Sequence, residues 1–307
     1  MKLPNFLVIG VPKAGTTSLW HLLRQHPNIY MPKLKEPRFF VDIPDSSPRN
    51  KQVSTLEEYR RLFDGATSEK MLGEASAGYF HNVQNPSEVS ELLNNPKLVV
   101  MLRNPMERAF SHFLFSKQKD LEPKSTTFRS AIRNKTVSVE DGIRQRPYVE
   151  VGFYNRHLVK WKSSFKKDKI NIILFEDFID NSVESAQEVY DFLGVDSSYR
   201  PDDVGRHAKS GIPKSEFLHK LLIEETGYIK KIIKKSTSNE IAEYVRTIMQ
   251  PIRRWLKNLN LKDKKIPQEE YDELRQMYRK DIIRLSENVD KNVLNWLGKN
   301  MKSKHKT

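Results

Sequence analysis

The sequence contains no cysteine and no long apolar segment. The lack of cysteine excludes disulfide bonds and thiolate catalysis, and it is compatible with a reducing cytoplasm, where we predict the protein resides. No stretch approaches the roughly 18 consecutive apolar residues of a membrane-spanning helix, so we expect no transmembrane segment. The N-terminal residues run directly into the first predicted strand, and we therefore expect no signal peptide.

Acidic residues are in the minority, because 39 Asp and Glu stand against 53 Lys and Arg, and the formal net charge is +14. A balance this basic indicates an anionic ligand, a nucleic acid, an acidic polymer or a membrane surface. For most lysines near the C-terminus we favour a simpler interpretation, a solvated surface. The 307 residues suffice for a sizeable core. We predict a single domain over residues 1–307, with a helical portion at about 215–300.

Residues 5–20 hold the most informative pattern of the chain. Phe6–Ile9 is a short, wholly apolar run that favours a strand buried on both faces, and a helix is predicted from Thr16 to Arg24. The loop between them, Gly10-x-x-x-x-Gly15-Thr16-Thr17, would present the free amides of the helix start to an anion. It is one substitution away from the nucleoside-triphosphate loop G-x-x-x-x-G-K-[ST].

The substitution changes the ligand that this loop suits. Thr16 replaces the lysine that would serve the β- and γ-phosphates, and the only lysine in the loop is Lys13. Such a loop can still hold a 5'-phosphate, but it is poorly built for a triphosphate with magnesium. The residues alone leave one alternative open, a tight β–α turn that binds nothing.

The run Pro12-Lys-Ala-Gly-Thr-Thr-Ser-Leu19 resembles the 5'-phosphosulfate loop of sulfotransferases that use 3'-phosphoadenosine 5'-phosphosulfate, PAPS. The resemblance implies an α/β protein with a three-layer P-loop-like fold, in which helices flank a central, mainly parallel sheet, plus a helical C-terminal part. It also implies that Lys13 stabilises charge in the transition state. The residues that would bind PAPS here are Pro12, Lys13, Ala14, Gly15, Thr16, Thr17 and Ser18.

A second phosphate site is predicted from Arg103 and Ser111. Lys97–Leu102 is a predicted buried strand that Arg103 ends, and Ser111 falls about two turns into a helix that Asn104 can cap and Pro105 can begin. Arginine binds phosphate oxygens through paired donors, although alone Arg103 is as well explained as a salt-bridge partner. The run Arg103-Asn-Pro-x-x-Arg-Ala-x-Ser111-His112 resembles the 3'-phosphate element of the same sulfotransferases. Two phosphate sites on two strand ends are what a 3',5'-bisphosphate nucleotide needs.

Glu36 is the first candidate for a general base. It lies between basic residues and shortly before Phe39 and Phe40, and Pro37 biases it away from helix. Without further information, an exposed glutamate in a charged loop is the favoured interpretation. Carbohydrate sulfotransferases and their bacterial relatives carry a glutamate shortly before a Phe-Phe pair, and the resemblance implies that Glu36 takes the proton from the acceptor.

Glu74 is the second candidate. A strand predicted at residues 70–76 ends in a polar tip, and catalytic groups are often found at the C-terminal ends of parallel strands. Glu74, Ser76 and Tyr79 are therefore pocket candidates, with Glu74 as base or acceptor contact. A structural carboxylate that holds a neighbouring loop is an equally good explanation of Glu74.

Three further segments are assigned by the resemblance or by their position. Lys169–Asp177 is a predicted strand, and the resemblance puts its Phe175 near the adenine. Residues 116–150 are expected to form an acceptor-facing lid. The basic loop 206–214 offers Lys209, Ser210 and Gly211 to the nucleotide, or it is a linker to C-terminal helices.

The predicted reaction is transfer of a sulfuryl group from PAPS to a hydroxyl, less often an amine, of a carbohydrate or small natural product. The product nucleotide is adenosine 3',5'-bisphosphate, PAP. The resemblance implies a reaction without metal, which agrees with the absence of any convincing cluster of His, Asp and Glu in the sequence. A P-loop nucleotide kinase or NTPase is a competitor, opposed by Thr16 and the lack of an obvious magnesium carboxylate. A nucleic-acid-binding protein is another; we expect no nucleic acid, because the basic residues are scattered and no known module is present.

Overall fold

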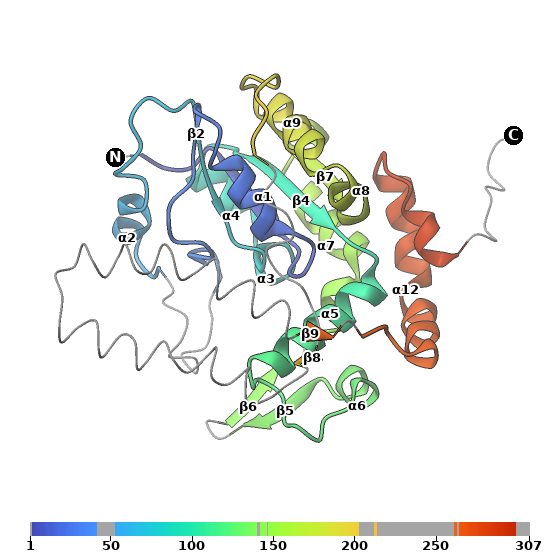
Figure 1. The fold of residues 1–307 in the computed structure, drawn as a ribbon. Coiled ribbons are helices and arrows are strands. Elements are labelled where there is room, and N and C mark those ends of the chain that lie inside the picture. The colour runs from blue at the N-terminus through green and yellow to red at the C-terminus, as the bar shows by residue number, and fades with distance from the viewer. Residues whose placement is uncertain are drawn as a thin grey trace, which may run out of the picture. The chain divides into compact units, whose positions relative to one another are not determined.

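Five short strands form one parallel sheet at the centre of the fold (Figure 1). In sheet order they are β2 Ile29–Tyr30, β3 Met71–Ala75, β1 Phe6–Gly10, β4 Lys97–Leu102 and β7 Ile170–Leu174. Every residue of β1 and β3 is buried, as expected for strands with helices on both faces. In the register of these strands, Leu7 lies beside Glu74 on one side and Leu98 on the other, so the strands end at the same edge.

The structure is a computed structural model that describes residues 2–41, 53–139, 142–145, 147–202, 212–213, 261–262 and 264–298. The chain divides into two compact units. The first comprises Met1–His112, Thr127–Ala208 and Pro267–Thr307, and contains the sheet. The second comprises Phe113–Thr126 and Lys209–Ile266. The prediction of a single domain stays a prediction.

Helices flank the sheet, and the predicted fold class is confirmed. α1 packs with α9 and α3 packs with α7, while α12 packs on α7 and on the short helix η3. The helices of the first unit are α1 Thr16–Leu23, α2 Leu56–Arg61, α3 Tyr79–Asn82, α4 Pro86–Leu92, α6 Phe128–Arg133, α7 Tyr154–Lys162, α8 Phe175–Asp180, α9 Ser182–Leu193 and α12 Gln268–Asn288, with 3-10 turns η1 Glu150–Gly152, η2 Lys167–Lys169 and η3 Val293–Leu297. α5 Pro105–Gln118 begins in the first unit and ends in the second.

Two small antiparallel pairs complete the described elements. β5 Thr136–Val139 pairs with β6 Gly142–Gln145 in the first unit, and β8 Ile212–Pro213 pairs with β9 Leu261–Lys262 in the second. Residues 116–150, the predicted lid, thus contain the end of α5, then α6 and the β5–β6 hairpin. Their acceptor-facing role stays a prediction.

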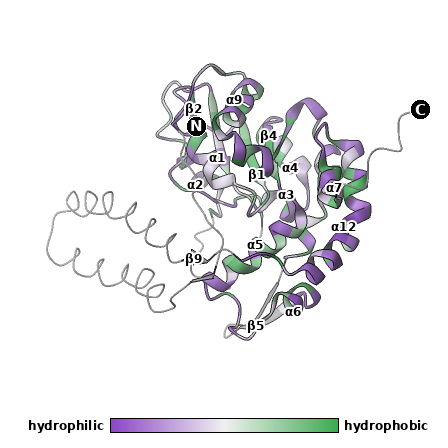
Figure 2. Ribbon diagram, turned by 45° about the vertical axis from the view of Figure 1, so that its right-hand side comes forward, coloured by the Kyte–Doolittle hydropathy of each residue, from purple (hydrophilic) through white to green (hydrophobic). Residues whose placement is uncertain are grey.

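Apolar residues concentrate in the strands and on the inner helix faces (Figure 2). α12 is mostly hydrophilic, yet one stripe along it is buried, as its spacing predicts. That stripe consists of Leu274, Tyr278, Ile282 and Leu285. It lies within the helical portion predicted at 215–300, of which residues 215–260, 263, 299 and 300 fall outside the described ranges.

The strand predicted at Lys169–Asp177 is shorter in the structure. β7 ends at Leu174, and the chain turns into α8 at Phe175. The physical reason is a tertiary contact, because Oε1 of Glu176 accepts a hydrogen bond from the amide of Asn104 at 2.8 Å. This bond fixes the acidic end of the segment beside the end of β4.

Candidate active site

The loop after β1 has the backbone shape of a phosphate cradle. Gly10 ends the strand and Gly15 precedes α1, with φ of 158° and 90°. A Cβ at Gly10 would lie 2.8 Å from Cβ of Phe80, and one at Gly15 would lie 3.1 Å from Cδ2 of Phe175. Gly10 therefore requires glycine for space as well as for conformation, and Gly15 requires it for its left-handed conformation. The first amides of α1 have no partner within the helix, so this end of the helix suits an anion.

The predicted ligands of this loop differ in their exposure. Ala14 and Thr16 are buried, whereas Pro12, Lys13, Gly15, Thr17 and Ser18 are half-buried. A loop whose lysine and hydroxyl side chains reach partly to solvent can contact a bound 5'-phosphate. The assignment of these residues to the nucleotide stays a prediction.

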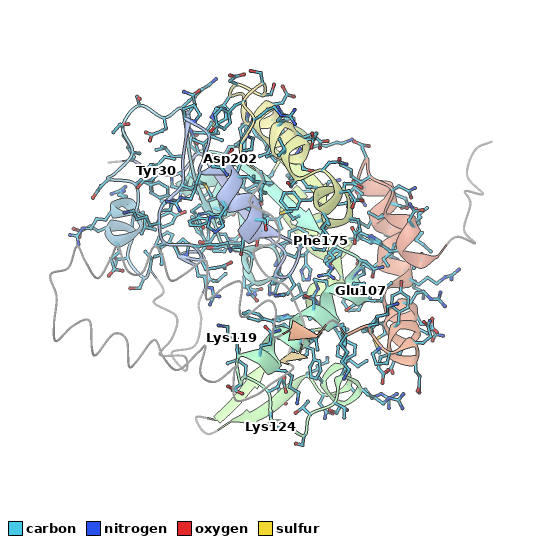
Figure 3. All side chains as sticks on the ribbon, viewed as in Figure 1. Tyr30, Glu107, Lys119, Lys124, Phe175 and Asp202 are labelled. Carbon is cyan, nitrogen blue, oxygen red and sulfur yellow. The ribbon has the colours of Figure 1, made fainter. Side chains whose placement is uncertain are left out.

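Arg103 connects the two predicted phosphate elements. Its Nη1 donates to the carbonyl of Lys13 at 3.2 Å, and its Cζ lies 4.5 Å from the centre of the Phe175 ring. The Phe175 ring lies at the C-terminal end of the sheet (Figure 3), where the sequence predicts the adenine. Burial lowers the pKa of the Arg103 guanidinium, and an arginine side chain still carries its charge at neutral pH. Ser111 is buried about two turns along α5.

Two residues that sequence analysis missed fix the backbone around Arg103. The Tyr154 hydroxyl donates to the Arg103 carbonyl at 2.8 Å, and Glu176 accepts from the Asn104 amide. Asn104 caps α5 as predicted, because its Oδ1 accepts from two amides of the first turn at 3.1 and 3.3 Å. Neither Tyr154 nor Glu176 carries a local signal for this role; both come from elements that only the fold brings to the end of β4.

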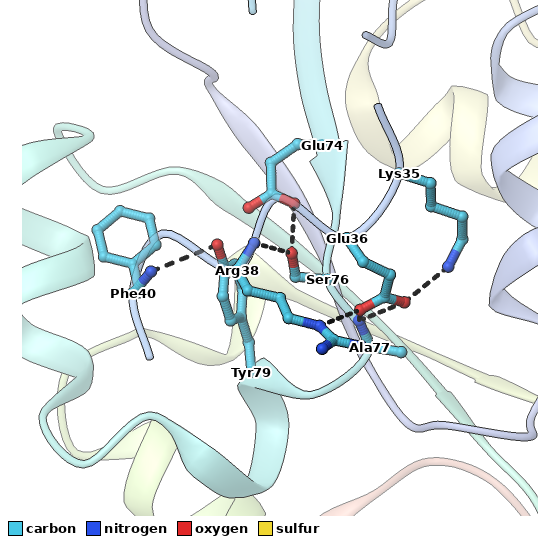
Figure 4. Close-up of polar contacts among 8 residues, drawn as sticks. All are labelled: Lys35, Glu36, Arg38, Phe40, Glu74, Ser76, Ala77 and Tyr79. Carbon is cyan, nitrogen blue, oxygen red and sulfur yellow. Dashed lines mark hydrogen bonds and ion pairs between the residues drawn. The ribbon is translucent and has the colours of Figure 1, made fainter. Parts of the chain in front are cut away.

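Glu36 lies above the C-terminal end of β3. Its amide donates to the Ala75 carbonyl at 2.9 Å, and its carboxylate oxygens accept from the Ala77 amide at 3.1 and 3.2 Å (Figure 4). Lys35 Nζ is 2.8 Å from Oε1, and Arg38 Nε is 3.6 Å from Oε2. The side chain is 26% exposed, so the carboxylate is held in place and still open to an acceptor. Because β3 and β1 are parallel neighbours, Glu36 and the phosphate loop occupy the same edge of the sheet.

Glu74 is in a different environment. It has no exposed surface, and its carboxylate accepts from Ser76 Oγ at 2.9 Å and from the Tyr59 hydroxyl at 3.3 Å. Ser76 Oγ in turn accepts from the Arg38 amide at 3.0 Å (Figure 4). Burial, the largest influence, raises the pKa of Glu74 to about 7. This geometry favours the alternative interpretation, a carboxylate that holds the loop carrying Glu36, over direct contact with an acceptor.

Other predicted site features lie elsewhere or are untested. Lys209, Ser210 and Gly211 lie outside the described residues. Within the described ranges, no group of three or more His, Cys, Asp and Glu could hold a metal ion. In the same ranges, no helix is both long and apolar enough to cross a membrane.

The family model of the sulfotransferase domain matches residues 3–215, which include both predicted phosphate elements and both glutamates. The chain belongs to the sulfotransferase family. Human heparan sulfate glucosamine 3-O-sulfotransferase 3B1 is 29% identical over 195 residues, covering 63% of this chain and 47% of that protein. Human carbohydrate sulfotransferase 15 is 29% identical over 250 residues, covering 63% of this chain and 44% of that protein. The chain thus spans about half the length of the curated relatives it matches.

Among solved structures, a sulfotransferase from Alicyclobacillus acidocaldarius superposes with a TM-score of 0.69 at 23% identity. The superposition covers 96% of this chain and 99% of that one, which supports the fold over nearly its whole length. The predicted sulfotransferase family and α/β fold are both confirmed.

Proposed function

We propose that this sulfotransferase moves a sulfuryl group from PAPS to a hydroxyl of an acceptor and releases PAP. The hydrogen bond from Arg103 to the Lys13 carbonyl is the observation that carries the proposal. It ties the end of β4 to the loop after β1, so that a nucleotide with phosphates at both its 3' and 5' positions can engage both at once. A nucleotide lacking the 3'-phosphate would leave the half-buried Arg103 with only Glu107, 3.9 Å away, as an anionic partner.

The chemistry follows from the edge of the sheet where these groups meet. In the transition state, negative charge develops on the sulfuryl oxygens and on the leaving 5'-phosphate. Lys13, Thr16, Thr17 and the start of α1 would stabilise that charge. Glu36, held by the Ala77 amide above β3, would act as general base and take the proton from the hydroxyl group of the acceptor.

A carbohydrate hydroxyl is the acceptor class that we favour. The support comes from the matched relatives, whose names describe glucosamine and carbohydrate sulfotransferases. A small natural product remains the second acceptor class, and an amine acceptor the less favoured chemistry. The cytoplasmic location and the independence from metal likewise stay predictions.

Calorimetric titration tests the nucleotide site directly. We expect PAP to bind at least about tenfold more tightly than ADP or magnesium-ATP, because only PAP engages both phosphate elements. Equal or tighter binding of magnesium-ATP would contradict the proposal and favour kinase chemistry. With PAP binding established, radiolabelled PAPS and a panel of neutral and acidic sugars would identify the acceptor.

A further inference from the structure

Arg108, one turn into α5, is a fully buried cation without a carboxylate partner among the described residues. Its Nη2 donates to the Tyr148 carbonyl, its Nη1 faces Nδ1 of His112 at 3.4 Å, and its Nε is buried with no partner there. An unpaired buried charge is costly, so an arrangement of this kind points to a role beyond packing. The site described above gives Arg108 no role.

The contact with Arg108 fixes the protonation of His112. A guanidinium is always charged and can only donate, so Nδ1 of His112 must accept. The ring proton then resides on Nε2, and His112 is a neutral donor. Burial first, then the charges of Arg108 and Lys13, hold the pKa of His112 well below its usual 6.5. The Tyr148 ring, 5.0 Å away and edge-on, fixes the plane of the imidazole.

His112 also belongs to the elements that carry the proposed site. It follows Ser111 on α5, and the strand end before α5 contacts the phosphate loop through the bond from Arg103 to the Lys13 carbonyl. The neighbouring helix α3 follows the Ala77 amide that holds Glu36. The ring is half-buried, and Nε2 has no hydrogen-bond partner among the described residues. The start of α5, the phosphate loop and α3 gather at the same end of the sheet (Figure 1).

We propose that His112 donates a hydrogen bond from Nε2 to the transferring sulfuryl group, and that Arg108 is a positioning residue that fixes the His112 tautomer. This inference rests on the proposed function. The 5'-phosphate would have the amides and hydroxyls at the start of α1, and the 3'-phosphate would have Arg103 and Ser111. The sulfuryl oxygens, between Lys13 and Glu36, are then the anionic partner that is left for His112.

His112 exchanges no proton in this reaction. The bond between sulfur and the 5'-phosphate oxygen breaks, and a bond between sulfur and the acceptor oxygen forms. The acceptor proton passes to Glu36, and the electron pair of the broken bond stays on the 5'-phosphate of PAP. The Nε2–H bond stabilises charge on the sulfuryl oxygens throughout.

The experiment compares the binding of PAPS and PAP to the full chain, because the two differ only in the sulfuryl group. The side-chain amide of His112→Gln places a donor near the position that Nε2 occupies in wild type. The shorter side chain of His112→Asn places one only near the position of Nδ1. We expect His112→Asn to weaken PAPS binding about tenfold with PAP affinity unchanged, and His112→Gln to bind both nucleotides like wild type. The matched controls are His26→Gln and His26→Asn. His26 is also buried, but it lies beyond the C-terminal end of α1 and contacts the Asp196 carbonyl at 2.9 Å.

Transfer of label from PAPS to water, or to an acceptor once found, gives the kinetic readout. His112→Asn should lower kcat about 100-fold with the KM for PAPS raised by no more than its loss of affinity, and His112→Gln should recover most of the rate. Histidine ring ¹⁵N spectra give a readout that does not depend on activity. The His112 signal should show the Nε2–H tautomer in wild type, and Arg108→Met should abolish that preference while PAP still binds.

The outcomes separate the two claims. If wild-type protein does not bind PAP, the proposed function fails and this inference fails with it. If PAP binds and His112→Asn retains wild-type PAPS affinity and kcat, the role of His112 is overturned and the proposed function stands. Equal losses in the Gln and Asn variants, or an Nδ1–H tautomer in the spectra, would also overturn it.

Discussion

At the scale of single residues, Glu36 and Glu74 show how position decides the role of a carboxylate. Glu36 has a left-handed backbone, with φ of 62°, and its partly exposed carboxylate is held by an amide and two cations. Glu74 has no exposed surface, and its carboxylate accepts hydrogen bonds from Tyr59 and Ser76. The sequence ranks Glu36 first through its resemblance, and the structure supplies a physical reason for the order.

The substitution Glu36→Gln tests the base. Glutamine retains an oxygen for the Ala77 amide but cannot take the proton from the hydroxyl group of the acceptor, so we expect kcat to fall at least about 100-fold. PAP affinity should stay within about threefold of wild type, because Glu36 contacts no predicted phosphate ligand. Steady-state kinetics and calorimetry check both values, with Glu57→Gln, an exposed partner of Arg61, as control. Undiminished kcat would remove Glu36 from the reaction.

The raised pKa of Glu74 makes a prediction about stability. Burial raises it from 4.5 to about 7, so the folded protein holds a proton that the unfolded chain releases in this window. The associated stability is present below about pH 4.5 and is lost as the pH rises to about 7. Glu74→Gln stays neutral and keeps an acceptor for Ser76 and Tyr59. Relative to wild type it should gain stability at about pH 8, at most about 3 kcal/mol, and little at about pH 5.

Urea unfolding at the two pH values measures this difference. Glu57→Gln again serves as control, because its exposed side chain should show no such pH dependence. If Glu74→Gln is less stable than wild type at both pH values, the carboxylate is charged and satisfied in the folded protein, and the interpretation of a neutral, loop-holding Glu74 is wrong.

At the scale of elements, the sequence predicts well what local pattern controls. The apolar runs predicted as strands become β1 and β4, and both are buried. The end of α9 at Gly194, where φ is 80°, also follows a local rule, because glycine adopts this left-handed conformation readily. The start of α8 could not be predicted, because Leu174, Phe175 and Glu176 continue a strand-like pattern and only the contact with Asn104 turns them. Arg108 belongs to the motif of the predicted 3'-phosphate element, but its complete burial could not be predicted, since that burial depends on elements distant in the chain.

The cap of α5 links an element to the site. Asn104→Ala removes the acceptor for two helix amides and should cost about 1 kcal/mol of stability. It should also weaken PAP binding several-fold, because Arg103 and Ser111 are placed by this helix start. Thr127→Ala is the matched control, since Thr127 caps α6 through the Ser130 amide at 3.2 Å. Thermal unfolding and calorimetry should show similar stability losses, with PAP affinity reduced only in Asn104→Ala; equal affinities would separate the cap from the site.

At the scale of the whole molecule, the net charge of +14 is a statement about ligands and not about fold. It does not distinguish a sulfated nucleotide from a nucleic acid. The distinction comes from where single cations are fixed, as Arg103 is by the Lys13 carbonyl and the Phe175 ring. The order of the strands, which brings β1, β3 and β4 side by side, is what places the residues of three distant segments at one edge.

This arrangement predicts that PAP stabilises the folded chain as a unit. At about 100 times its Kd, a ligand that binds only the folded state adds about 2.7 kcal/mol, which raises Tm by about 4 °C in a protein of this size. ADP at the same concentration should raise Tm by much less, because it lacks the phosphate that Arg103 and Ser111 would bind. Arg103→Ala should erase the difference between PAP and ADP, whereas Arg200→Ala, which removes an exposed partner of Glu184, should preserve it. Equal shifts of Tm by PAP and ADP in the wild type would mean that the end of β4 binds no phosphate, even if the loop after β1 binds the 5'-phosphate.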